Sequence, residues 1–414
     1  MSAPLDKISL FQYSLLALPL AFVGLPLYIH APDFYAANVG LSLTTIGIII
    51  LAVRLFDAVQ DPVIGVLSNK FSHLRPAIML GGMLVLAAGL LMVFHPPDTL
   101  SALWFALSLI LATTAFSIIS INFNALGSLW SKDTNQKTRI TTWREGVGLA
   151  GLLVGAVLPS IFGLHIVSYI LVGILALCGL AFMRWNSAHA DIITHNEGAH
   201  DAFKWRTLLH EPNIRFFGVY ALSMFASAIP AVLVIFFIRD RLDAEALTGL
   251  FLFLYFISGA AGMPLWQYLA KRMSKYRAWM VGMIVAAVTF IWAYFLGAGD
   301  VWQYAMICVF SGLALGAELA LPPAILSDMI DKQDNRGQTS LYFSALTFLL
   351  KATLALGSGV AFLLLGQAAF VPAAQNSAQA LGTLSFTYAL LPCLIKIAAA
   401  LMLWRVIKHE ENGG

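Results

Sequence analysis

Hydrophobic residues in this chain form long unbroken runs separated by short polar breaks. A helical run of about 20 apolar residues is long enough to cross a hydrocarbon layer of about 30 Å. The first run continues past Pro26 without a cleavage site of the secretory kind, so we expect it to be a retained helix. The pattern predicts twelve membrane-spanning helices, at residues 10–36, 43–67, 76–95, 101–130, 139–162, 165–185, 213–238, 246–270, 278–297, 301–327, 338–365 and 381–405.

The composition agrees with this pattern. The 414 residues are 60% hydrophobic and 11% charged, whereas a soluble domain has roughly 25% charged residues. The fold class predicted is therefore an all-α polytopic membrane protein. The three cysteines lie within apolar runs at spacings that fit neither a disulfide framework nor a zinc site. The chain also lacks a phosphate-binding glycine loop with its lysine, which argues against an ATP-driven pump.

Basic residues fall in alternate breaks between the runs. They cluster at residues 70–75, 132–139, 184–215, 271–277 and 332–336, after the even-numbered spans. Arg239 and Arg241 are the exception, and acidic residues accompany them. Cytoplasmic loops are enriched in lysine and arginine. We therefore expect both termini to be cytoplasmic.

The longest polar stretch divides the chain into two halves. It predicts an N-terminal six-helix bundle at 1–185, a cytoplasmic linker at 186–212 and a C-terminal six-helix bundle at 213–414. A weak repeat supports this division, because "GVLSNKFSHLRP" and "GMPLWQYLAKRMSKYR" both pass from glycine through a helix end to a basic turn. Repeated halves are typical of secondary transporters, whose substrate site lies between them.

A few ionisable residues remain inside the predicted spans. An ionisable group at the centre of a span costs about 2.5–3.5 kcal/mol on insertion scales. Such groups usually face a partner or a water-filled cavity, so each is a candidate functional residue. They are Arg54, Asp57, Asp61, Arg144, Glu145, Glu318, Lys351 and Lys396.

The second span contains the densest group of these charges. Arg54, Asp57 and Asp61 are spaced at i, i+3 and i+7, which places them on one helical face. Two carboxylates one turn apart repel each other, and a proton or a small cation such as Na⁺ would relieve the repulsion. Pro62 would free backbone carbonyls as further ligands. The alternative is an Arg54–Asp57 ion pair that only holds helices together.

The remaining intramembrane charges are more scattered. Arg144 and Lys351, in opposite halves, are candidates for binding an anionic or polyhydroxylated solute or for offsetting the carboxylates of the second span. Glu318 is a candidate for the cavity and for a second proton site, with a hydrogen-bonded structural role as the alternative. We expect Glu145 to point away from Arg144, and Lys396 to extend towards the membrane interface.

Several segments together resemble a known family. "RLFDAVQDPVIGVLSNK" is similar to the second-helix signature of the glycoside–pentoside–hexuronide:cation symporters, the melibiose permease-like branch of the major facilitator superfamily. "TTWREGVGLAG" resembles the start of helix five, and "PLWQYLAKRMSKYR" the loop between helices eight and nine. "ILSDMIDKQDNRGQTSLYFS" and "LLKATLALGSG" resemble the following loop and helix eleven. The resemblance covers nearly the whole chain.

The resemblance implies roles for matching residues. Asp57 and Asp61 would bind the coupling cation, and Arg144 and Lys351 would line the substrate cavity. This chain departs from the sugar-transporting members in helix four, where Ser120 replaces an aspartate and Asn124 stands where an aromatic residue would stack on the sugar. Their helix-one aspartate has no counterpart here. The cation half of the site is kept, while the galactoside half is changed.

The resulting hypothesis is a symporter with the major facilitator fold in a bacterial inner membrane, with H⁺ or Na⁺ as coupling ion. Asp57, Asp61 and Ser120 would bind the ion, and Arg144, Lys351, Asn124 and Glu318 would face the solute. The solute expected is a sugar, glycoside or sugar acid. The alternatives are a lysolipid or other amphipathic anion carried on the same fold, and a membrane sensor that transports nothing.

No enzyme activity is expected, because no nucleophile–base or metal-ligand spacing occurs among the spans. No cofactor, nucleic acid or resident metal is expected either, apart from transported Na⁺ at Asp57 and Asp61. The partners are the solute and membrane lipid. One chain contains a complete pathway, so we expect it to function as a monomer.

Overall fold

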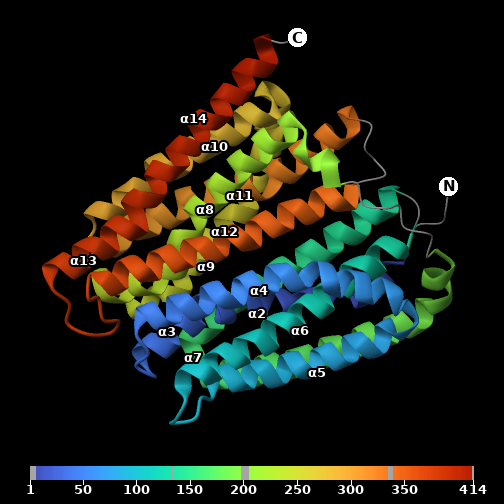
Figure 1. Cartoon of the computed structure of the whole chain (residues 1–414), viewed down its shortest axis with the longest axis horizontal. Helices are drawn as coiled ribbons and strands as arrows, with labels where there is room; N and C mark the ends of the chain where they lie inside the picture. The colour runs from blue at the N-terminus through green and yellow to red at the C-terminus, as the bar shows by residue number, and fades with distance from the viewer. Residues whose placement is uncertain (1–5, 132–133, 197–204, 334–338, 413–414) are drawn as a thin grey trace. The chain divides into compact units, whose positions relative to one another are not determined.

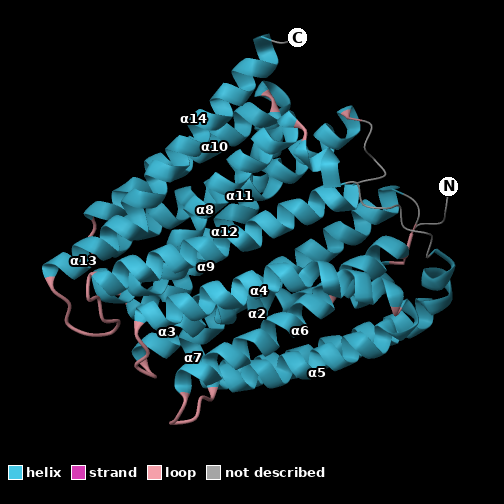
Figure 2. Ribbon diagram, in the orientation of Figure 1, coloured by secondary structure: helices cyan, strands magenta, loops and turns pink. Residues whose placement is uncertain are grey.

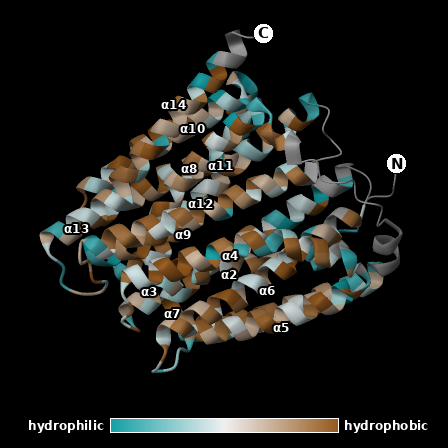
Figure 3. Ribbon diagram, in the orientation of Figure 1, coloured by the Kyte–Doolittle hydropathy of each residue, from teal (hydrophilic) through white to brown (hydrophobic). Residues whose placement is uncertain are grey.

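A computed structural model describes residues 6–131, 134–196, 205–333 and 339–412. Helices and loops make up all of this described part (Figure 2). Hydrophobic residues extend along the helices, and hydrophilic residues are concentrated towards helix ends and loops (Figure 3). Within the described ranges, 11 helical segments are long and apolar enough to cross a membrane.

The chain forms two compact units. The first unit comprises residues 1–41 and 55–199, and the second comprises residues 42–54 and 200–414. The change at 199/200 falls inside the polar stretch 186–212. The helix that contains residues 43–70 contributes to both units, because its first twelve residues group with the second.

The helices of the first unit follow one another with short connections, and α5 and α6 lie side by side (Figure 1). They are α1 (Lys7–Ser14), α2 (Ala17–Leu25), η1 (Pro26–His30), α3 (Ala31–Ala37), α4 (Leu43–Lys70, shared), η2 (Ser72–Leu74), α5 (Arg75–Phe94), α6 (Ser101–Leu129) and α7 (Thr134–Asn196).

In the second unit, α10 packs against both α11 and α14, and α14 packs against α8 (Figure 1). The elements are η3 (Trp205–Leu209), α8 (Glu211–Phe236), η4 (Phe237–Arg241), η5 (Glu245–Leu247), α9 (Thr248–Met273), α10 (Lys275–Phe290), η6 (Ile291–Phe295), α11 (Val301–Lys332), α12 (Thr339–Gln367), α13 (Ala378–Ser385), η8 (Phe386–Leu390) and α14 (Leu391–Asn412).

Helix α7 accounts for the difference between twelve predicted spans and eleven described segments. It contains both spans predicted at 139–162 and 165–185, joined at Gly163, whose φ of 72° and ψ of 159° are not helical. Glycine adopts positive φ without the steric cost of a side chain, so the chain changes direction here without an intervening loop. Helix α7 also continues to Asn196, beyond the predicted end at 185. Hydropathy indicates where apolar character ends, and a helix can extend further into water.

Glycines let pairs of helices approach closely in each unit. On α11, a Cβ at Gly316 would lie 2.6 Å from the carbonyl oxygen of Gly259 on α9, and one at Gly262 would lie 2.6 Å from that of Leu313. In the first unit, a Cβ on Gly151 of α7 would collide with the carbonyl of Leu18 on α2. Without a hydrophobic driving force between helices in lipid, such close packing is a main source of their attraction.

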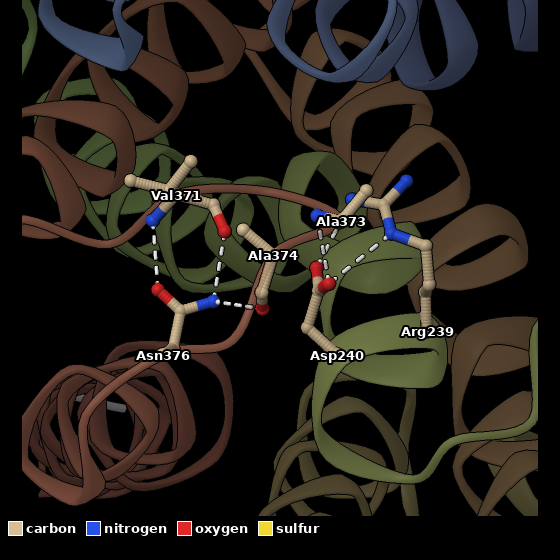
Figure 4. A network of polar contacts seen from close by, with 6 residues as sticks. All are labelled: Arg239, Asp240, Val371, Ala373, Ala374 and Asn376. Atoms are coloured by element: carbon tan, nitrogen blue, oxygen red, sulfur yellow. Dashed lines mark hydrogen bonds and ion pairs between the residues drawn. The ribbon is translucent and has the colours of Figure 1, made fainter.

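A polar network fixes the loop between α12 and α13 (Figure 4). Asp240 accepts hydrogen bonds from Arg239 at 3.0 and 3.2 Å and from the backbone N–H of Ala373 at 2.9 Å. The Asn376 side chain exchanges two 2.8 Å hydrogen bonds with the backbone of Val371 and donates one to the carbonyl of Ala374. Arg239, one of the two arginines that depart from the charge pattern of the loops, is therefore engaged in a structural ion pair.

We expect Gly316→Ala to lower the free energy of unfolding by about 1–3 kcal/mol, because the added methyl group overpacks the α9–α11 contact. Thermal unfolding of the detergent-purified protein measures this. The matched control is Gly382→Ala on α13, where a Cβ meets nothing within 4 Å. Alanine is the better helix former there, so the control should be neutral or slightly stabilising. Equal destabilisation by both changes would contradict the packing argument.

Candidate functional site

Helix α4 carries Arg54, Asp57 and Asp61 without interruption, even though Pro62 follows directly. Arg54 and Asp57 are buried, and Asp61 is half-buried. Because proline has no backbone N–H, the carbonyl four residues before Pro62 lacks its helical donor. The helix therefore presents carboxylates and a freed backbone carbonyl within two turns.

Neighbouring polar side chains hold the Asp57 carboxylate in place. Its Oδ1 accepts one hydrogen bond from Ser117 Oγ on α6 and one from Gln60 Nε2, both at 3.0 Å. Gln60 in turn accepts a hydrogen bond from Thr114 Oγ1 at 2.9 Å. These contacts connect α4 to α6 inside the first unit and surround the carboxylate with oxygen and amide groups.

Sequence reasoning selected Ser120 as the helix-four residue beside the aspartates, but the hydroxyl that contacts Asp57 belongs to Ser117, one turn earlier. Ser120 is half-buried, and its role in cation coupling stays a prediction. The polar spacing of Thr114 and Ser117 on α6 was the signal available in the sequence. Choosing between neighbouring turns needed the register of α6 against α4.

Arg144 on α7 contacts Asn124 on α6, so two of the predicted cavity residues meet. Its Nη1 donates to Asn124 Oδ1, and the guanidinium is also close to the Tyr13 hydroxyl of α1. Nη2 and Nε donate to Glu145 Oε1 at 2.6 and 3.2 Å. The expectation that Glu145 points away from Arg144 is therefore wrong. Long side chains on adjacent helical positions can still bend together, and here they form an ion pair.

Tyr13 is a member of this cluster that sequence reasoning did not select. Its hydroxyl donates to the carbonyl of Phe123 at 2.9 Å, and a Cβ at Gly127 would overlap it. The tyrosine is fully buried. Lys351, the other predicted cavity cation, lies half-buried on α12 in the second unit.

The second unit contains a buried ion pair between Glu318 on α11 and Lys396 on α14. Glu318 also accepts hydrogen bonds from Ser223 Oγ at 2.6 Å and Ser227 Oγ at 2.9 Å, both from α8. The expectation that Lys396 extends to the membrane interface is wrong, because its side chain ends among these groups and the residue is 6% exposed. The ion pair with Glu318 keeps the Lys396 ammonium buried in the protein.

Metal coordination would need several ligating side chains close together. No group of three or more histidine, cysteine, aspartate and glutamate side chains in the described ranges is close enough to hold a metal ion.

Comparison with known proteins relates the chain to membrane transporters. A family model described as "MFS/sugar transport protein" matches residues 10–408. The Bacillus subtilis (strain 168) protein "Uncharacterized symporter YjmB" is 22% identical over 85% of this chain and 82% of its own length. The Gallus gallus "Sodium-dependent lysophosphatidylcholine symporter 1" is 22% identical over 78% of this chain and 71% of its own length.

A solved structure shares the fold. The nucleoside transporter NupG matches with a TM-score of 0.70 at 14% identity, covering 97% of this chain and 100% of the NupG chain. At this identity the likeness concerns the fold alone. Together with the family match, it confirms the predicted all-α membrane fold class.

We expect Ser117→Ala to destabilise the protein by about 1–2 kcal/mol, because it removes a buried hydrogen bond to a carboxylate. The measurement is thermal unfolding at constant pH and salt. Ser120→Ala, on the same helix, is the matched control and should stay within about 0.5 kcal/mol of the wild type. The reverse order of the two effects would show that α6 contacts Asp57 in the register expected from the sequence.

Proposed function

Because this chain belongs to the MFS/sugar transport protein family, we propose that it is a cation-coupled symporter of a small polar solute and works by alternating access. The chain is an integral membrane transport protein rather than an enzyme. The family and the name of the Bacillus subtilis relative support transport of this kind. We propose in addition that transport is coupled to a cation, that the solute is small and polar, and that both termini are cytoplasmic.

The observation that carries the proposal is the Asp57 carboxylate, buried on α4 and hydrogen-bonded to Ser117 of α6. Asp61 lies one turn further along the same helix. A cation at this position would meet the oxygen ligands that transporters use for H⁺ and Na⁺. It would also reduce the repulsion between the two carboxylates.

Solute recognition is proposed for the Arg144 cluster and Lys351. The guanidinium and the Asn124 amide are hydrogen-bonding groups suited to hydroxyl-rich solutes. Because Glu145 already neutralises Arg144, the cluster favours a neutral sugar or glycoside over a sugar acid. By linkage, the cation must strengthen solute binding by the same factor as the solute strengthens cation binding.

A second candidate solute is a lysolipid. It is favoured by the likeness to the Gallus gallus symporter, which covers most of this chain. The same cation site would serve either solute. We propose a bacterial inner membrane as the location, with both termini cytoplasmic as the basic loops indicate.

Thermal unfolding in mild detergent with glycosides, pentoses, sugar acids and lysophosphatidylcholine, each with and without Na⁺ at two pH values, identifies the solute. A ligand at 100 times its dissociation constant stabilises by about 2.7 kcal/mol. A shift that depends on Na⁺ or on low pH would identify the solute and the ion together. A shift with lysophosphatidylcholine alone would select the second candidate.

In proteoliposomes, we expect Asp57→Asn and Asp61→Asn to abolish gradient-driven accumulation of the panel compound that shifts unfolding, while solute exchange continues. The physical reason is that an amide cannot exchange a proton or balance the charge of Na⁺. Asp98→Asn, at an exposed position of the same unit, is the control and should accumulate normally. Full accumulation by both α4 variants would refute the assignment of the coupling site.

A further inference from the structure

The ammonium of Lys396 is surrounded by more oxygen atoms than it has protons to donate. Its Nζ contacts the Ser227 hydroxyl at 2.7 Å, the Ser223 carbonyl at 3.0 Å, the Ser223 hydroxyl at 3.1 Å and the Glu318 carboxylate. A lysine has three N–H donors, so four acceptors cannot all receive a separate hydrogen bond. Nondirectional attraction between a cation and surrounding oxygen atoms describes this geometry better than a one-to-one ion pair.

Two transmembrane helices form this oxygen cage, which we define as Glu318, Ser223 and Ser227, and a third helix supplies the ammonium. Glu318 comes from α11, the serines come from α8, and the ammonium enters from α14. The cage combines a carboxylate, two hydroxyls and a backbone carbonyl. Hard monovalent cations in membrane proteins are bound by this class of ligand.

Prolines add unpaired carbonyl capacity on both helices that form the cage. Pro322 cannot donate to the carbonyl of Glu318, and Pro230 cannot donate to the carbonyl of Ala226, because proline lacks an N–H. In an apolar span such breaks are tolerated where other groups satisfy the backbone.

Stability alone does not account for the pair. A buried ion pair often contributes no more than an apolar pair of the same volume, because both charges must be desolvated. Removing only one partner is strongly unfavourable, since the other charge then lacks compensation. An ionised Glu318 carboxylate in the cage therefore requires a positive charge beside it.

We infer that the cage is a binding site for a monovalent cation of about ammonium size, and that the tethered ammonium of Lys396 is its permanent occupant. Under the proposed function, this fixed charge cannot travel with the solute. The mobile coupling cation of the proposed function would then bind at Asp57 and Asp61 in the first unit and not in the cage. The cage lies within the second unit, and cation binding there does not depend on which solute is transported.

The test compares two ways of removing the charge. Lys396→Ala removes the ammonium and opens space, whereas Lys396→Met removes the charge but fills the space. The purified variants are unfolded thermally in equal concentrations of ammonium, methylammonium, sodium, potassium and choline chloride at constant pH. The response of the wild type to each salt is subtracted, because the first unit can respond to cations by itself.

We expect ammonium to raise the melting temperature of Lys396→Ala by several degrees relative to choline, with no such rise for Lys396→Met. The double variant Lys396→Ala/Glu318→Gln should lose the response, because the carboxylate that attracts the cation is gone. A response that persists in the double variant would overturn the inference. So would an alanine variant that unfolds in every salt while the methionine variant folds.

These outcomes separate the inference from the proposed function. If the α4 variants lose accumulation while Lys396→Ala shows no shift in melting temperature with ammonium, the cation-binding cage is refuted and the symporter proposal stands. If Lys396→Ala responds to ammonium while the α4 variants accumulate solute normally, the cage stands and the coupling site at Asp57 and Asp61 is refuted.

Discussion

The hydrocarbon interior of a membrane offers no solvent for a charge, so ionisable side chains within a span usually face a partner or a water-filled cavity inside the protein. This constraint determines which helices of the chain are joined by polar contacts. Asp57 joins α4 to α6, Arg144 joins α7 to α6, and Glu318 joins α11 to α8 and α14. Such contacts need close helices, and the glycine-mediated packing of α9 on α11 and of α2 on α7 supplies a rigid frame for them.

The two units satisfy the constraint with different chemistry. In the first, hydroxyl and amide groups from α4 and α6 are hydrogen-bonded to Asp57. In the second, the ammonium of Lys396 lies beside the Glu318 carboxylate. A carboxylate that is balanced by a tethered cation cannot exchange it, whereas a carboxylate that is balanced by a mobile cation can. The fixed Lys396 charge therefore cannot serve as the mobile ion of the symport proposed above.

Much of this arrangement could be predicted from the sequence, because hydropathy and charge determine the free-energy cost of placing a segment in lipid or in water. The apolar runs located the membrane helices, and the i, i+3, i+7 spacing located Arg54, Asp57 and Asp61. The partners could not be predicted, since they come from distant segments. Lys396 meets Glu318 across 78 positions, and hydropathy alone favoured its extension to the interface. Ser117 and Ser120 differ by one turn of one helix, a choice that only the packing of α6 on α4 decides.

The helix that carries the proposed coupling site also belongs to both units. Residues 42–54 group with the second unit, and the residues from 55 onwards group with the first. The boundary lies between Arg54 and Asp57, which are about 4.5 Å apart along the helix axis. Helix α4 is continuous across this boundary, so the residues on either side of it belong to one helix with one series of backbone hydrogen bonds.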